Sequence, residues 1–224
     1  MIEAMMSKVF EQSAFNPKNS FDLPGFFKNE TTDSKIKSFA EADRPLNIEN
    51  MNDFRDLTLE ERQLVQKKTG WTDDQLNKCI ISDTGVIHYK CDNEELKGII
   101  HPCNVEYKQK QIEHNGLVIE VVGPEFNSRL DVQLPEPLYK ESNLKQFKEC
   151  NNQLKNAVSE NETLRNSFSP RQLEAIELGK TPEGYTWHHD FTPGKMQLVE
   201  RREHDRTIGG AAHTGGKSIW GGGY

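Results

Sequence analysis

The sequence predicts an α+β fold, with a small N-terminal region of helices and antiparallel strands, a long connecting helix, and a C-terminal β-hairpin followed by a helix. Three patterns predict it: capping boxes before short helical runs, an apolar period of two in the middle of the chain, and three- and four-residue apolar spacing after it. With 224 residues, 34% hydrophobic and 28% charged, the chain suits two small modules better than one large core.

The first segment, residues 1–56, is rich in Asn, Asp, Ser, Lys and Phe and has no sustained helical or strand period. We therefore expect a leader or loosely ordered segment there. Its start lacks a basic region followed by an apolar one, so a cleaved secretory signal is not expected. No stretch of the sequence approaches the roughly 20 apolar residues that span a bilayer, which excludes a membrane protein.

Residues 57–140 are expected to form a small α+β accessory domain that begins with two short helices. Each helix starts with a capping box, in which a threonine and the Glu or Gln three residues later bond each other's backbone N–H groups. The two boxes are Thr58 with Glu61 and Thr72 with Gln75. The first helix is expected to end near Lys68, ahead of Gly70, and the second to lie around Leu76 and Cys79.

The rest of this domain alternates apolar and polar residues, which is typical of strands with one buried face. The expected strands are 86–89, 105–107, 117–122 and 130–132. We expect them to form one small antiparallel sheet. A tight turn is expected at His114-Asn115-Gly116, because Asn-Gly adopts positive φ at low cost.

Residues 141–168 are expected to form the connecting helix. Apolar side chains recur there mainly at three- and four-residue steps from Leu144 to Leu164, a stripe that we expect to pack against the modules rather than bind a partner. Several asparagines lower the helix propensity, so fraying is expected near Glu160.

The C-terminal module, residues 169–224, begins with Ser169-Pro170-Arg171-Gln172, a capping signature with proline at the first helical position. We expect that helix to end at Gly179. The following elements are expected to be a strand at 185–190, a turn at 191–195, a partner strand at 196–199 and a helix from Glu200 to Thr207.

The charge balance argues against broad electrostatic capture of nucleic acid, because 28 Lys and Arg against 35 Asp and Glu give a net charge of -7. The cysteines show no CxxC pair and no zinc-ribbon spacing, so we expect reduced thiols, with a disulfide between Cys91 and Cys103 as the alternative.

Four of the seven histidines, His188, His189, His204 and His213, lie close together in the C-terminal module. Successive side chains of a strand face opposite sides, so His188 and His189 point in different directions. One imidazole can then hold a metal ion while the other takes a proton from water. Three histidine ligands suit an open catalytic site, because structural zinc sites usually take four ligands, often including Cys, and no cysteine follows Cys150.

These histidines belong to a longer pattern: Trp187-His188-His189, then Met196-Gln197-Leu198-Val199, then His204, then His213-Thr214-Gly215-Gly216. In this order the segments resemble the WHH-type branch of the HNH/endonuclease VII nuclease superfamily, found at the C-terminus of bacterial polymorphic toxins. The resemblance covers roughly residues 169–224. It implies a ββα-metal (HNH-like) nuclease module, in which a hairpin and a helix grip one divalent ion.

The resemblance further implies a metal-dependent endonuclease that hydrolyses phosphodiester bonds of nucleic acid, with DNA favoured over RNA. His189 would be the general base, because an imidazole with a pKa of about 6.5 can deprotonate water at neutral pH. The metal ligands would be His188, His204 and His213, and the ion Zn, Ni, Mg or Mn. Contacts to substrate phosphates would come from Lys195, Arg201 and Arg202.

The separation between His204 and His213 departs from the family pattern. Nine residues on one helix would place two side chains on opposite faces. The helix must therefore end near Ile208, with Gly209-Gly210 allowing the chain to turn. The sequence leaves open whether the loop returns His213 to the metal.

As to biological role, the resemblance implies the toxin part of a bacterial competition system, with a cognate immunity protein as partner. We expect export by a specialised secretion system without a cleaved signal peptide and activity in the target-cell cytoplasm, or otherwise a cytoplasmic protein. Two other functions stay open: a non-catalytic interaction protein with a structural histidine–zinc site, and a repair or restriction HNH nuclease that is not a toxin. The remaining histidines, His88, His101 and His114, are expected to be surface or structural residues.

Overall fold

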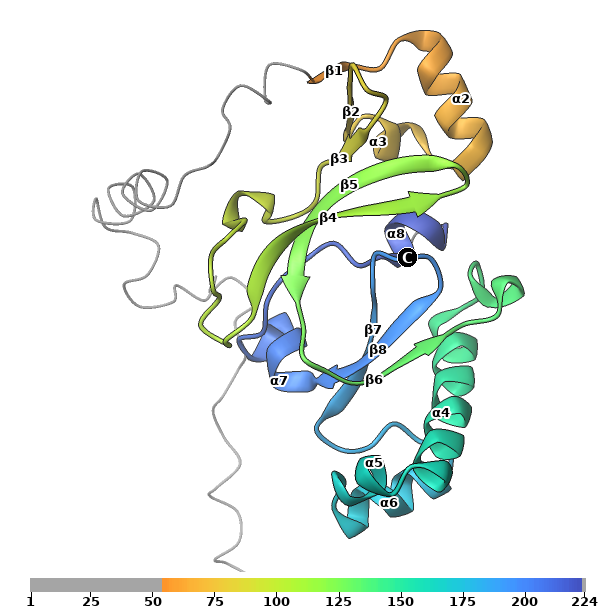
Figure 1. The fold of residues 1–224 in the computed structure, drawn as a ribbon, viewed down its shortest axis with the longest axis vertical. Coiled ribbons are helices and arrows are strands. Elements are labelled where there is room, and N and C mark those ends of the chain that lie inside the picture. The colour runs from red at the N-terminus through yellow and green to blue at the C-terminus, as the bar shows by residue number, and fades with distance from the viewer. Residues whose placement is uncertain (1–53, 223–224) are drawn as a thin grey trace, which may run out of the picture. The chain divides into compact units, whose positions relative to one another are not determined.

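Two β-sheets organise residues 54–222, the part of the chain that the computed structural model describes. Helices and strands are mixed along the chain, so the predicted α+β class is confirmed (Figure 1). The leader expected over residues 1–56 lies outside the described residues, apart from its last three, which form β1 (Phe54–Asp56). Within the described range, no helix is both long and apolar enough to cross a membrane.

The two predicted capping boxes are both present at the starts of α2 (Leu59–Thr69) and α3 (Asp73–Leu76). In the first, the Glu61 N–H donates to Thr58 Oγ1 at 3.2 Å and the Thr58 N–H donates to Glu61 Oε2 at 2.8 Å. The second helix is shorter than expected. It ends at Leu76, and Cys79 begins a strand instead, because its neighbours pair with the strands on either side.

A five-stranded sheet has the order β1-β2-β3-β5-β4. Its further members are β2 (Cys79–Ser82), β3 (Ile87–Tyr89), β4 (Glu106–His114) and β5 (Leu117–Glu125). The Asn115-Gly116 turn between β4 and β5 is confirmed, with φ of 51° and 68°. The prediction that all strands of this sheet are antiparallel was wrong, because β3 and β5 pair in parallel. The chain crosses over after β3, so that β4 lies at the edge of the sheet and β5 lies between β4 and β3.

The second sheet has the order β6-β8-β7, from β6 (Ser128–Gln133), β7 (Tyr185–His189) and β8 (Lys195–Glu200). The predicted β-hairpin of the C-terminal module is confirmed, with Trp187 opposite Leu198 and His189 opposite Met196. The prediction that residues 130–132 belong to the same sheet as the strands before them was wrong, since they lie in β6, which pairs with β8. Periodicity shows that a segment is a strand but not which remote strand it pairs with. The division of the chain at residues 140 and 168 stays a prediction.

The expected single connecting helix is broken into α4 (Asn143–Glu160) and α5 (Glu162–Asn166). At the break, Asn161 has an extended backbone, and its side-chain oxygen accepts the N–H of Leu164 at 2.9 Å, which starts the second helix. The weak point expected near Glu160 is therefore where one helix ends. The buried stripe of α4 packs into the core through Cys150, Leu154 and Val158.

The last helices are α6 (Pro170–Glu177), α7 (Arg201–His204) and α8 (Lys217–Trp220), and short 3-10 turns cover Glu94–Leu96, Glu136–Leu138 and Arg206–Ile208. Helix α6 has the predicted Ser169 and Gln172 capping box. The helix expected from Glu200 to Thr207 was too long. It ends at His204, because Asp205 leaves the helical conformation and its carboxylate accepts the N–H of Thr207 at 3.0 Å.

The glycine-rich segment before α8 packs tightly against the end of β7. The Gly216 N–H donates to the His189 carbonyl at 2.9 Å. At the C-terminal end of α8, the Trp220 indole donates to the Asp190 carbonyl at 2.9 Å, and the Trp71 indole donates to the Ile219 carbonyl at 2.7 Å. These bonds hold the C-terminal part of the described chain against both β7 and the α2 to α3 connection.

Replacing Gly216 by alanine tests this close approach. The added Cβ would lie 1.8 Å from the Asp190 carbonyl oxygen, so backbone must shift. We expect Gly216→Ala to lower the free energy of unfolding by about 1 to 3 kcal/mol, the usual cost of overpacking. Urea denaturation measures this, with Ser218→Ala as the control expected near wild type. An unchanged midpoint for Gly216→Ala would contradict the packing described here.

Candidate metal centre

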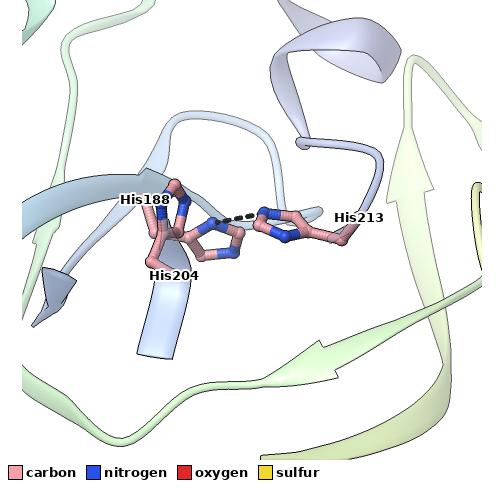
Figure 2. Close-up of side chains that lie close together, drawn as sticks. All are labelled: His188, His204 and His213. Atoms are coloured by element: carbon pink, nitrogen blue, oxygen red, sulfur yellow. Dashed lines mark hydrogen bonds between the residues drawn. The ribbon is translucent and has the colours of Figure 1, made fainter. Parts of the chain in front are cut away.

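Three histidine side chains from separate elements converge beside the three-stranded sheet. His188 lies on β7, His204 is the last residue of α7, and His213 lies in the loop that precedes α8. One ligand nitrogen from each lies within 4.8 Å of the other two. Figure 2 shows the three rings directed toward one another. The loop therefore returns His213 to the other two histidines, which the sequence had left open.

The long segment between His204 and His213 turns back over α7 through backbone bonds. Gly209 has a left-handed φ of 94°, and the Ala211 N–H then donates to the Glu203 carbonyl at 2.8 Å. A residue with a side chain would be strained at that φ, which explains the glycine. After α7 ends at His204, a 3-10 turn and a reversal of the chain at Gly209 thus connect His204 to His213.

Two residues from the N-terminal half fasten the end of this loop. The Asn93 amide donates to the Ala212 carbonyl at 2.7 Å, and the Tyr107 hydroxyl donates to the same carbonyl at 2.5 Å. Two residues after Ala212, Thr214 Oγ1 accepts the Asp92 N–H at 2.8 Å. His213 lies between these anchors, so its position depends on contacts more than 100 residues away in sequence.

Phe126, in the connection from β5 to β6, packs against all three imidazoles. Its ring centroid lies 4.8 Å from that of His188, 5.3 Å from that of His204 and 5.2 Å from that of His213. The phenyl ring is buried, with 5% of its surface exposed. It restricts the ring rotations of the histidines and excludes water from one side of the cluster. Phe126 could not be predicted from the sequence, because no periodic or motif signal distinguishes it from other phenylalanines of the chain.

The surroundings of the three histidines keep them uncharged near neutral pH. Burial, followed by the proximity of His213 and His204, lowers the pKa of His188 well below its ordinary range. Burial also lowers the pKa of His204, to about 4, and that of His213. Since the neutral imidazole is the form that binds a metal, the cluster is ready to bind without first losing protons.

The donor pattern of the cluster fits a divalent ion. His213 donates its Nδ1–H to the Ala211 carbonyl at 2.8 Å, the bond to a backbone oxygen that commonly fixes a metal-binding histidine. Its Nε2 then faces His188 Nδ1 at 3.2 Å. Two nitrogens on one tetrahedral ion with bonds of 2.0 to 2.1 Å lie about 3.3 Å apart, so this spacing suits a shared ion. Three ligands leave a position open for water or substrate.

His189 faces the other side of β7, as strand alternation predicts, and makes a different set of contacts. Its ring packs against Phe147 and Trp220, and its Nε2 lies 2.9 Å from Gln146 Oε1. Burial, followed by the positive charge of Lys217 and by His204, lowers the pKa of His189 to about 3. His189 is therefore neutral near pH 7, the state from which an imidazole accepts a proton.

A pocket of about 670 Å³ joins these groups. Of the three basic residues expected to contact phosphates, Arg201 lines the pocket and is held by Asp205, whose Oδ2 accepts from its Nε and Nη2 at 3.1 Å each. Lys195 pairs with Asp131 and Arg202 with Glu200, and neither is among the described residues that line the pocket. Arg206, which was not among the predicted contacts, also lines the pocket.

The remaining histidines and the cysteines lie apart from this pocket. His88 contacts Glu94 and Glu120, His101 contacts Cys103, and His114 is buried at the end of β4. All four cysteines are free, including the alternative disulfide pair Cys91 and Cys103.

Comparison with known families gives a match to part of the chain. Residues 117–215 match the family model of the DNase/tRNase domain of colicin-like bacteriocins. The matched range covers less than half of the chain and contains all three histidines of the cluster together with His189. The match supports a toxin nuclease domain in this chain, and with it nuclease activity on a nucleic acid substrate. No curated protein and no solved structure matches the chain.

Removing one imidazole of the cluster should weaken metal binding. Loss of a ligand leaves two nitrogens, so we expect His213→Ala to lower the affinity for Zn²⁺ or Ni²⁺ by at least about 10- to 100-fold. Isothermal titration calorimetry measures this, and His88→Ala, which alters a histidine outside the cluster, serves as the control. Equal affinities for His213→Ala and wild type would show that the ion binds elsewhere.

Proposed function

We propose that this protein is a metal-dependent endonuclease of the WHH-type HNH kind, which hydrolyses phosphodiester bonds of nucleic acid. The observation that carries the proposal is the convergence of three neutral, largely buried imidazoles within 4.8 Å, inside the range matched by the bacteriocin nuclease family. A fourth imidazole, His189, lines the same pocket. The roles proposed for these four histidines, three metal ligands and one general base, are those that the resemblance implies.

In this proposal, His188, His204 and His213 hold one divalent ion. When bound, the ion supplies positive charge that stabilises the phosphate oxygens as negative charge develops on them. The open ligand position gives a phosphate oxygen access to it. The choice among Zn, Ni, Mg and Mn is left to experiment, although three imidazoles suit zinc and nickel in particular.

His189 acts as the general base that takes a proton from the attacking water. The low pKa of the buried ring keeps it neutral but makes it a weak base. An anionic phosphate group placed beside the ring would raise the pKa of His189 toward the range in which proton transfer is effective. Substrate binding and activation of the base are thus coupled by charge.

Arg201 and Arg206 are the basic side chains of the pocket that would contact the phosphates next to the scissile bond. Arg201 is oriented for this role by its bonds to Asp205. We assign Lys195 and Arg202 to contacts with more distant parts of a long substrate, because neither is among the described residues that line the pocket. DNA is the preferred substrate in this proposal.

As to its role, we propose that the protein is the toxin part of a bacterial competition system. The supporting observation is the match to a domain of bacteriocins. Such a toxin would be exported by a specialised secretion system, act in the cytoplasm of the target cell, and be neutralised in its producer by a cognate immunity protein.

A cleavage assay tests the enzyme. Purified protein is incubated with plasmid DNA and, separately, with total RNA in the presence of Mg²⁺, Mn²⁺, Ni²⁺ or Zn²⁺. We expect cutting that EDTA abolishes and that falls about 100- to 10,000-fold in His189→Ala, the range of general-base contributions. The variant should still bind metal. Folded, metal-loaded wild type that cuts neither polymer would instead favour a structural histidine–zinc site.

Expression in a bacterial host tests the toxin role. We expect wild-type protein to stop growth and damage the chromosomal DNA, whereas His189→Ala, produced to the same level, leaves growth unchanged. Colony counts and DNA integrity are the readouts. Full growth of cells that contain active enzyme would overturn the toxin role and favour a repair or restriction nuclease.

A further inference from the structure

Asn143, the first residue of α4, has its side chain fixed by a lysine of α8. Lys217 is buried, and its Nζ donates to Asn143 Oδ1 at 2.7 Å and to the Glu141 carbonyl at 2.9 Å. An ammonium group has donors only, so the atom of Asn143 that faces it must be the amide oxygen. A flipped amide would point its own hydrogens at those of Lys217. The orientation of the Asn143 amide is therefore determined.

This orientation turns the amide nitrogen of Asn143 away from the lysine. Asn143 is partly buried and lines the pocket that contains the histidines. Its Nδ2 carries two hydrogens, and neither bonds to an acceptor in the part of the chain that the structure describes. Lys217 does not by itself require an amide at this position, since an aspartate would accept the same bond. What distinguishes asparagine from aspartate here is the second group, which is a donor.

Asn143 lies beside the proposed base. It precedes Phe147 by one helical turn, so that both residues are on the same face of α4. The ring of Phe147 packs against that of His189, with centroids 5.6 Å apart, and both of these residues also line the pocket. The pocket arginines, Arg201 and Arg206, come from α7 and the 3-10 turn after it. Asn143 thus adds a hydrogen-bond donor to the pocket from a separate element.

We propose that Asn143 is a substrate-binding residue whose Nδ2–H group donates to a phosphate oxygen of the nucleic acid. This inference rests on the proposed function, because it requires a phosphodiester in the pocket. A bond from an amide to an anionic oxygen is stronger than a bond between two neutral groups. Unlike the arginine contacts, it brings no positive charge. Its contribution is to position one phosphate near His189 rather than to attract a polyanion from a distance.

The variant Asn143→Asp tests this contact. Aspartate keeps an oxygen for Lys217 and is favourable in the first turn of a helix, so we expect the urea midpoint of wild type. It replaces the donor by an anionic oxygen that repels phosphate. Binding is measured by fluorescence anisotropy with labelled DNA and, separately, RNA of the same sequence. The protein is loaded with Zn²⁺ and carries His189→Ala, so that the substrate is not cut. We expect Asn143→Asp to raise Kd about 10- to 100-fold.

Asn152→Asp is the matched control, because it makes the same change on the same helix. Asn152 is exposed and is not among the described residues that line the pocket. We expect its Kd to equal that of the background protein. Zn²⁺ affinity should be unchanged in both variants, because neither residue belongs to the histidine cluster. Equal Zn²⁺ affinity together with a raised Kd would locate the defect of Asn143→Asp in substrate binding.

Substrates with one uncharged methylphosphonate in place of a phosphate separate a direct bond from a general effect of the added charge. A direct bond predicts one position at which the replacement weakens binding to the background protein but not to Asn143→Asp. At that position the loss of an acceptor matters only while the donor is present. General repulsion by the new carboxylate would instead change the response at several neighbouring phosphates, and this result would contradict the proposal.

Two further results would overturn the inference. One is an unchanged Kd in folded Asn143→Asp, and the other is an equal rise of Kd in Asn152→Asp. Failure of the proposed function looks different. A wild type that binds nucleic acid but cuts neither polymer would contradict the enzyme, while the Kd values would still decide whether Asn143 contacts the substrate. Absence of binding to both polymers would overturn the inference and the proposed function together.

Discussion

The alternation of side chains along β7 is the constraint on which the rest of the site depends. It sends His188 to one face, where His204, His213 and Phe126 surround it, and His189 to the other, where α4 and α8 cover it. Adjacent residues thus receive separate chemical settings without any irregular backbone between them. A metal ligand and a proton acceptor can then be placed side by side while each keeps its own hydrogen-bond partners.

The residues that hold the surroundings of His188 and His189 in place on the two faces of β7 come from parts of the chain that are remote in sequence. Asn93 and Tyr107 fasten the loop that carries His213, and they lie before the range matched by the bacteriocin nuclease family. On the other face, Gln146 and Lys217 connect the start of α4 with α8. The histidine site is therefore not a property of the hairpin and its helix alone. It also requires the five-stranded sheet and the interrupted helix.

Desolvation is the dominant electrostatic effect in the site. The whole chain carries a net charge of -7, so it has no general attraction for a polyanion. Burial is the first cause of the lowered pKa of His188, His189 and His204. The cost of charging these rings keeps them neutral, and in the proposed function a bound divalent ion and the pocket arginines would provide the positive charge locally. Binding of nucleic acid would rest on these groups rather than on a basic surface.

The sequence by itself determined the features that depend on neighbours a few residues away. The capping boxes at Thr58, Thr72 and Ser169, the Asn115-Gly116 turn and the hairpin of β7 and β8 each need only local contacts, and all were predicted. Tertiary structure alone decided the pairing of β6 with β8, the parallel pairing of β3 with β5, the return of His213, and the contacts that Phe126 and Gln146 make with the histidines. Those features depend on contacts between segments far apart in the chain, and periodicity within one segment carries no information about the partner that it meets.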